Sequence, residues 1–230
     1  MFKHQDQRVG VFIDTQNMYY SARNLFKRKV NFKNIVEDAV AGRKLIRSLA
    51  YVIRTQSDDA RPFFEALQKA GIETREKDLL EYDSGHKKGD WDVGLAIDVV
   101  QMLDVLDVVV IISGDGDYQP LVDYVKSRGR MVEVMAFRAT TSSALIEVVD
   151  DYVDLSQNKR RYLIGPVAKT SSKPKGRQGS KATKNTKTPQ KKTEDLEDKL
   201  EEAILGGFFM PSKGDDEDDQ KDLRNRRLEF

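Results

Sequence analysis

The sequence predicts an α/β protein with a doubly wound, mainly parallel sheet of about five strands and helices on both faces. Apolar runs that suit strands alternate with segments of helical spacing from Arg8 onward. Residues 108–112 are continuously apolar and β-branched, which is typical of a strand buried on both faces of a parallel sheet. Repeated strand-helix-strand units imply right-handed crossovers, and these place helices on both faces of one sheet.

The individual elements follow from the same alternation. Five apolar runs are the predicted strands, at residues 8–13, 47–53, 72–77, 107–113 and 130–137. The segments between them predict helices over residues 18–28, 32–42, 59–70, 91–106 and 118–128. Gly71 and Gly129 directly follow two of these helices, so we expect them to be C-caps.

Composition limits the remaining possibilities. Hydrophobic residues make up 39% and charged residues 33% of the 230, which is too little apolar content for the whole chain to pack tightly. The absence of cysteine excludes disulfides, thiolate zinc sites and cysteine nucleophiles. No stretch approaches the roughly 18 apolar residues that cross a bilayer, and the start lacks the apolar segment of a signal peptide. We expect a cytoplasmic protein without a membrane partner.

Charge is unevenly distributed along a chain whose net charge is +1. Residues 166–193 carry nine Lys or Arg and no acid, whereas residues 194–230 carry thirteen acids against six bases. The composition therefore predicts four parts: an N-terminal extension over 1–7, a folded domain over 8–158, a basic disordered linker over 159–193, and an acidic tail over 194–230.

The tail has two features of its own. The stretch EDLEDKLEEAIL places Leu196, Leu200, Ala203 and Ile204 at the spacing of a short amphipathic helix. Phe208, Phe209 and Met210 then interrupt an otherwise polar segment. They suggest a linear motif that anchors a protein partner.

Four acidic residues lie near the edge where open parallel sheets bind ligands. Asp14 ends the first predicted strand, Asp115 and Asp117 follow the fourth, and Asp92 lies in the first turn of the preceding helix. Each alone has an alternative role in a turn or a helix cap. Two unit charges about 4 Å apart repel by roughly 4 kcal/mol at an effective dielectric near 20, so four converging carboxylates predict a bound divalent cation.

The ligand chemistry indicates which cation this is. Carboxylate oxygens favour hard metals, and the two histidines, His4 and His86, are far apart in the sequence. We therefore expect Mg²⁺ or Mn²⁺ in preference to zinc. Water activation by such an ion suits attack on a phosphodiester.

Three stretches, FIDTQNMY, KKGDWDVGLAIDVV and SGDGDYQPLVDYVKSRG, occur in the order found in NYN domains. On these motifs residues 8–155 resemble the LabA-like group of NYN domains, within the PIN-like nucleases. The resemblance implies a PIN-like (Rossmannoid) fold, Mg²⁺- or Mn²⁺-dependent ribonuclease activity, and the four aspartates as metal-site acids, with Asn17 as a polar helper. The chain departs from the family at Asp90 and Trp91, where relatives commonly have Asn and a small apolar residue.

Several other residues are candidates for contact with RNA. Lys87 and Lys88 precede the second motif and Arg138 follows the last strand, so we expect phosphate contacts from Lys88 and Arg138. Trp91 and Tyr118 have two open interpretations, stacking on an unpaired base or packing in the core. The basic linker would make RNA binding depend on salt.

The predicted function is metal-dependent hydrolysis of single-stranded RNA. One alternative is a non-catalytic RNA-binding or regulatory scaffold with the same fold. Another is a haloacid-dehalogenase-like phosphatase, which requires a second acid two residues after Asp14, where this chain has Gln16. The sequence leaves open the identity of the RNA, endo- or exonuclease action, the number of metals, and the oligomeric state, with a homodimer as one option.

Overall fold

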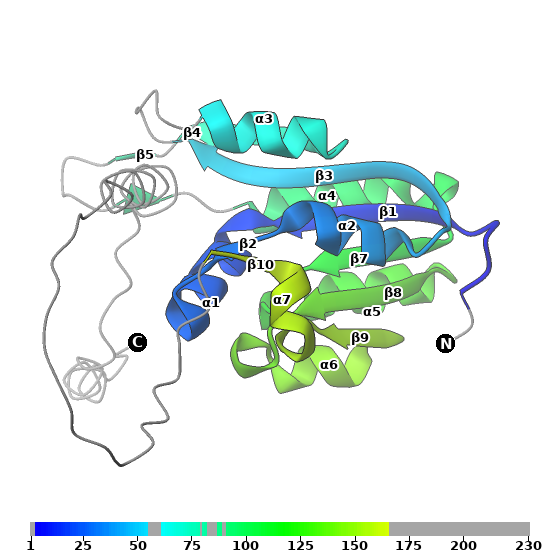
Figure 1. Ribbon diagram of the computed structural model, residues 1–230. Coiled ribbons are helices and arrows are strands. Elements are labelled where there is room, and N and C mark those ends of the chain that lie inside the picture. The colour runs from blue at the N-terminus through cyan, green and yellow to red at the C-terminus, as the bar shows by residue number, and fades with distance from the viewer. Residues whose placement is uncertain (1–2, 55–60, 79, 82–86, 89–90, 166–230) are drawn as a thin grey trace, which may run out of the picture.

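A six-stranded sheet in the order β4-β3-β1-β7-β8-β9 forms the centre of the structure (Figure 1). The structure is a computed structural model that describes residues 3–54, 61–78, 80–81, 87–88 and 91–165. All neighbouring strands in this sheet are parallel. The strands are β1 (Arg8–Asp14), β3 (Lys44–Arg54), β4 (Glu73–Asp78), β7 (Val108–Ile112), β8 (Met131–Ala136) and β9 (Asp151–Asp154). The α/β fold and the five predicted strands are confirmed, and β9 is an additional edge strand.

Two short antiparallel ladders and a set of helices complete the described residues. The ladders pair β2 (Lys29–Val30) with β10 (Leu163–Ile164), and β5 (Leu80–Glu81) with β6 (Lys87–Lys88). The α-helices are α1 (Thr15–Phe26), α2 (Phe32–Val40), α3 (Arg61–Lys69), α4 (Asp92–Met102), α5 (Gln119–Ser127), α6 (Ser143–Val148) and α7 (Lys159–Tyr162). The 3-10 turns are η2 (Leu103–Val105), η3 (Gly116–Tyr118), η4 (Arg138–Thr140) and η5 (Leu155–Asn158).

Glycine ends two of the helices as predicted. Gly71 after α3 and Gly129 after α5 have φ values of 73° and 72°, a left-handed conformation that costs glycine little. At the other end of a helix, the Asp14 carboxylate caps α1 by accepting a hydrogen bond from the Asn17 backbone N–H.

The strand order contains one reversal of winding. The chain runs outward from β1 through β3 to β4, returns to β7 on the other side of β1, and continues to β8 and β9. Right-handed crossovers then place α1, α2 and α3 on one face and α4, α5 and α6 on the other. In Figure 1, α2 lies in front of the sheet while α4 and α5 lie behind it. The switch point of the winding is therefore at the adjacent carboxyl ends of β1 and β7.

The core lies between these layers. All five residues of β7 are buried, as expected for a central strand with a helical layer on each face. Leu95 and Val99 of α4 are fully buried against the back of the sheet. No helix among the described residues is both long enough and apolar enough to cross a membrane.

The folded domain continues beyond residue 158, where the sequence predicted the start of a disordered linker. Arg161 in α7 holds Asp38 of α2 through two hydrogen bonds of 2.6 Å, and the Tyr162 hydroxyl donates to the same carboxylate at 2.8 Å. Leu163 and Ile164 then pair with β2. Residues 159–165 are therefore ordered parts of the fold, and the rest of the predicted basic linker, the amphipathic helix and the acidic tail lie outside the described residues.

Candidate active site

Three predicted acidic residues come together at the switch point. Asp14 is the last residue of β1, Asp115 follows the end of β7, and Asp92 is the first residue of α4. They are close enough for the charges of Asp92 and Asp115 to raise the pKa of Asp14, although burial raises it more. Three segments that are far apart in the sequence thus contribute to one acidic group.

Hydrogen bonds fix the carboxylate of Asp14 at the centre of this group. Its Oδ1 accepts from the Asn17 backbone N–H at 3.0 Å, and its Oδ2 accepts from the Ser113 hydroxyl at 3.2 Å. The Tyr118 hydroxyl lies between two carboxylates, 2.9 Å from Asp92 Oδ1 and 3.4 Å from Asp14 Oδ2. Tyr118 therefore links the first and second motifs through one O–H group.

The environment of this group disfavours negative charge. Burial, and then the charges of Asp92 and Asp115, raise the pKa of Asp14 to about 6, against the opposing hydrogen bonds from Asn17 and Ser113. Burial, and then Asp14 and Asp92, raise the pKa of Tyr118 well above its usual range. In the described part of the chain, neither Asp14 nor Asp115 forms an ion pair with a Lys or Arg. Ionised Asp14 thus lacks a compensating cation from this part of the protein.

The loop after β7 is held in place by its neighbours. Gly114 donates its backbone N–H to the Asn17 side-chain oxygen at 3.0 Å, so Asn17 connects the first and third motifs. A Cβ at Gly114 would lie 2.7 Å from the Thr140 carbonyl oxygen, so only glycine allows η4 to approach this loop so closely. The role of Asn17 in the structure is to position this loop.

Asp117 is more exposed than the other three aspartates. The Asp115 carboxylate accepts a hydrogen bond from the Asp117 backbone N–H at 3.0 Å and so caps η3. The Asp117 side chain is exposed. The structure therefore gathers Asp14, Asp92 and Asp115 and places Asp117 at the rim.

Trp91, where the chain departs from the family pattern, packs within the domain. Its indole N–H donates to the Val52 carbonyl of β3 at 3.0 Å, and its ring centroid is 5.5 Å from that of Tyr51. A Cβ at Gly94 would lie 2.5 Å from the Trp91 ring, so this glycine makes room for the indole. Through these contacts Trp91 packs the start of α4 against β3. It thereby positions Asp92, the next residue in the chain.

Of the two interpretations predicted for Tyr118, packing in the core is confirmed. The residue is only 2% exposed, and its hydroxyl contacts carboxylates, so it is not available to stack on a base. The sequence had placed it next to the acidic motif without indicating this contact. Its position directly after GDGD, where a short helix begins, was the one available signal.

The candidate phosphate contacts are described only in part. Arg138 opens η4, is exposed, and donates its backbone N–H to Asp154. The same turn packs against Gly114, so Arg138 is near the third motif. Lys88 lies in β6, whose side chains the structure does not describe, and His86 and Asp90 are outside the described residues.

The carboxylates of this acidic group can be compared with the ligands that a divalent metal requires. Among the residues that the structure describes, no group of three or more His, Cys, Asp or Glu side chains is arranged to hold a metal ion. Mg²⁺ does not need such a group, because it keeps several waters and is usually bound by one or two carboxylates. Asp14 and its acidic neighbours supply oxygen ligands whose mutual repulsion a divalent cation would relieve. The residues present fit a hydrated hard cation.

Comparisons with known proteins identify the family of the domain. The sequence matches the NYN domain family over residues 8–156. The low amplitude and bright protein LabA of Synechococcus elongatus is 26% identical over 161 residues, which cover 65% of this chain and 84% of LabA. The crystal structure of a Vibrio parahaemolyticus protein of unknown function is similar, with a TM-score of 0.64 and 27% identity. That likeness covers 71% of this chain and 100% of the Vibrio protein.

Proposed function

Because the chain belongs to the NYN domain family, whose nuclease-type domains are part of the PIN-like superfamily, we propose that it is a metal-dependent ribonuclease that cleaves single-stranded RNA. The observation that carries this proposal is the convergence of Asp14, Asp92 and Asp115 on one partly buried position at the switch point. The similarity to LabA covers the same domain. A perturbed carboxylate at a sheet switch point is characteristic of functional sites.

The residues of the site have distinct roles in this proposal. Asp14, Asp92 and Asp115 hold Mg²⁺ or Mn²⁺, directly or through water, and the exposed Asp117 assists at the rim. Ser113 and Tyr118 hold the carboxylates in place by hydrogen bonds. When bound, the cation supplies activation of a water and stabilisation of negative charge on phosphate oxygens.

RNA binding draws on cations around the same edge. Arg138 is exposed beside the third motif and is the described residue best placed to contact a phosphate. We extend the proposal to Lys88 and to residues 166–193, whose nine positive charges would make affinity fall as salt rises. Removal of the chain after Gly165 should then weaken RNA binding and flatten its salt dependence.

Cleavage of a labelled single-stranded RNA by matched variants tests the proposal. Asp14→Asn and Asp115→Asn are expected to reduce the rate by about 100-fold or more, an effect of the size that removing metal-site groups commonly has. EDTA should do the same to the wild type, and Mg²⁺ or Mn²⁺ should restore it. The control is Asp104→Asn, which removes an exposed acid in η2. This residue lies near the amino ends of the strands, away from the candidate site.

Three outcomes would count against cleavage by this site. Equal activity in wild type and both variants would identify a contaminating nuclease. Loss of activity in Asp104→Asn as well would indicate a general effect of charge. An inactive wild type that still binds RNA would favour a regulatory scaffold. Circular dichroism of each variant confirms that the fold is retained.

A further inference from the structure

The outward face of α4 carries an apolar stripe. Val93, Ile97 and Val100 are 68%, 50% and 40% exposed and follow one another at the i, i+4, i+7 spacing of a single helix face. The inward face of the same helix is fully buried through Leu95 and Val99. A helix that is apolar on both faces normally packs against a partner on each. Among the described residues, the outward side of α4 has no such partner.

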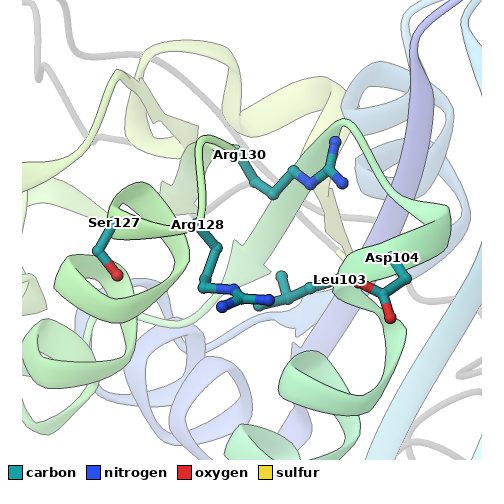
Figure 2. A pocket seen from close by; sticks show the side chains of 5 residues that line it. All are labelled: Leu103, Asp104, Ser127, Arg128 and Arg130. Atoms are coloured by element: carbon teal, nitrogen blue, oxygen red, sulfur yellow. The ribbon is translucent and has the colours of Figure 1, made fainter.

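Beyond the end of α4 lies a pocket between η2 and the C-terminal end of α5. Leu103 and Asp104 line this pocket of about 240 Å³ from one side, and Ser127, Arg128 and Arg130 line it from the other (Figure 2). Asp104 lies four residues after Val100 and thus on the same face of the α4–η2 segment. On α5, Tyr124 precedes Ser127 and Arg128 by three and four residues and is 44% exposed. The stripe and the pocket follow one another along α4 and η2, and together with the exposed Tyr124 of α5 this surface is here called the α4–α5 groove.

The pocket end of the α4–α5 groove is cationic. Arg128 forms no ion pair with a described residue, and Figure 2 shows it extending toward Leu103. Arg130 lies 3.8 Å from Asp107, but that carboxylate already binds Arg8 at 2.7 Å and 3.0 Å. Asp104 is the single acid among the residues that line the pocket. An occupant with an apolar stripe and acidic flanks would suit this groove.

We propose that the α4–α5 groove is the docking site of residues 194–204 of the same chain. Leu196, Leu200 and Ala203 repeat the i, i+4, i+7 spacing of the α4 stripe. Six of these eleven residues are Asp or Glu, which matches the cationic pocket. An amphipathic helix that lays such anchors into an apolar groove is a recurrent mode of peptide recognition.

The size of the groove favours this segment over a second copy of the chain. Eleven helical residues extend about 16 Å, the same length as the α4 stripe with the adjoining pocket residues. A stable protein–protein interface typically takes about 800 Å² and 20–30 residues from each partner. Three aliphatic side chains and Tyr124 supply only a fraction of that.

The connecting segment is long enough to reach the groove. Residues 166–193 would span about 30 Å as a flexible coil and about 95 Å when extended. A folded domain of this size has a radius of gyration of about 15 Å. Tethering also raises the local concentration of the segment to the millimolar range, so a weak helix–groove contact suffices.

Disulfide trapping in the full-length chain tests the docking directly, because the protein has no cysteine of its own. The test variant is Ile97→Cys with Leu200→Cys, and the matched control is Lys69→Cys with Leu200→Cys. Lys69 is exposed on α3, on the other face of the sheet. Under mild oxidation we expect the test pair to close an intramolecular disulfide at least about 10-fold faster than the control pair.

Other outcomes would overturn the proposal. Equal closure rates would show a tethered segment that does not dock. Covalent dimers of the single variant Ile97→Cys, in place of closed monomers, would assign the groove to a second copy. Leu200→Asp gives a second test. It removes one apolar anchor of the segment, so undocking should raise amide hydrogen exchange in α4 several-fold. Unchanged exchange contradicts docking. None of these measurements uses RNA, so their result is independent of the proposed ribonuclease activity.

Discussion

The two ends of β1 are in opposite electrostatic states. At the amino end, Arg8 binds Asp107 through two side-chain hydrogen bonds of 2.7 Å and 3.0 Å, and these bonds lower the pKa of Asp107 to about 2. At the carboxyl end, burial and neighbouring acids raise the pKa of Asp14 to about 6. One strand therefore has a stabilised carboxylate near its start and a destabilised one at its end.

The same contrast extends across the sheet. Arg43 precedes β3 and binds Glu133 of β8 at 2.6 Å and 2.9 Å, with side-chain exposures of 0% and 1%. Arg43 also donates to the Ala39 and Val40 carbonyls at the end of α2. The buried ion pair at the amino ends of the strands is thus complete, whereas Asp14 at the carboxyl ends forms no ion pair with a Lys or Arg of the described residues. Because an uncompensated charge costs stability, this difference supports our proposal of a cation at the carboxyl ends.

Breaking the pairing at the amino edge should have the largest effect on stability. Arg43→Met leaves Glu133 buried without its main partner, so we expect a loss of about 3–5 kcal/mol in the free energy of unfolding. Urea denaturation followed by circular dichroism measures this. A loss below about 1 kcal/mol would mean that water or Lys3, which lies 3.2 Å from Glu133, compensates the charge.

A double variant separates charge from packing. Arg43→Met combined with Glu133→Met removes both charges, and we expect it to recover a large part of the lost stability. Both variants should cleave RNA at the wild-type rate wherever they are folded, because Arg43 and Glu133 are at the edge opposite to the candidate site. Reduced cleavage by the folded double variant would show that the two edges are coupled.

The stability of the protein should depend on pH through Asp14, at the carboxyl ends of the strands. Its pKa in the folded protein, about 6, is above its ordinary value of 3.8, so its contribution to stability is present below about pH 4 and is lost as pH rises through 6. The loss amounts to at most about 3 kcal/mol, since each pKa unit corresponds to about 1.4 kcal/mol. Asp14→Asn should therefore be more stable than wild type at pH 7.5, by up to about 3 kcal/mol, with little advantage at pH 4.

Melting temperatures of both proteins between pH 4 and 7.5 measure this difference. Adding Mg²⁺ at pH 7.5 should stabilise the wild type and leave Asp14→Asn unchanged. Parallel pH curves for the two proteins would show that Asp14 is ionised in the fold at no cost, and would remove the main support for a cation at this site.

The hydroxyl of Tyr118 should have an intermediate effect. Tyr118→Phe keeps the buried ring and removes the O–H group between Asp14 and Asp92. We expect RNA cleavage to fall about 10-fold, as for groups that orient metal ligands, with a change in stability of about 1 kcal/mol. The matched control is Tyr124→Phe, whose ring is exposed on α5. A weaker Mg²⁺ response of the rate in Tyr118→Phe alone would assign the residue to positioning, whereas equal rates in both variants would make the hydroxyl structural.

Local patterns in the sequence predicted most of the fold. The five apolar strands and the two glycine caps follow from residue type alone, because a central parallel strand and a left-handed φ each require particular residues. The edge strand β9 was missed because its sequence, DYVD, is half polar and only half-buried. Residues 159–165 were assigned to the linker because their place in the fold depends on Arg161 binding Asp38, a contact between residues 123 positions apart.

The candidate site was predictable to a similar degree. The rule that ligands bind at the carboxyl ends of strands selects Asp14 and Asp115, and helix spacing adds Asp92. It does not show that the Asp115 carboxylate caps η3 and leaves Asp117 exposed. Nor could it decide whether Trp91 stacks on a base or fills the space above Gly94, since that depends on how α4 packs on β3.

The amino end of β1 provides the smallest effect, with the opposite sign to Asp14. The lowered pKa of Asp107 means that its contribution to stability is present above about pH 4 and is lost as pH falls through 2. Its side chain is 33% exposed, so solvent screening limits the contribution to about 1 kcal/mol or less. Asp107→Asn should therefore be slightly less stable than wild type at pH 7.5, where Asp14→Asn is more stable. Melting temperatures of both variants in the same buffers compare the two ends of the strand. If both melting temperatures shift in the same direction from wild type, the contrast between the two ends does not arise from these carboxylates.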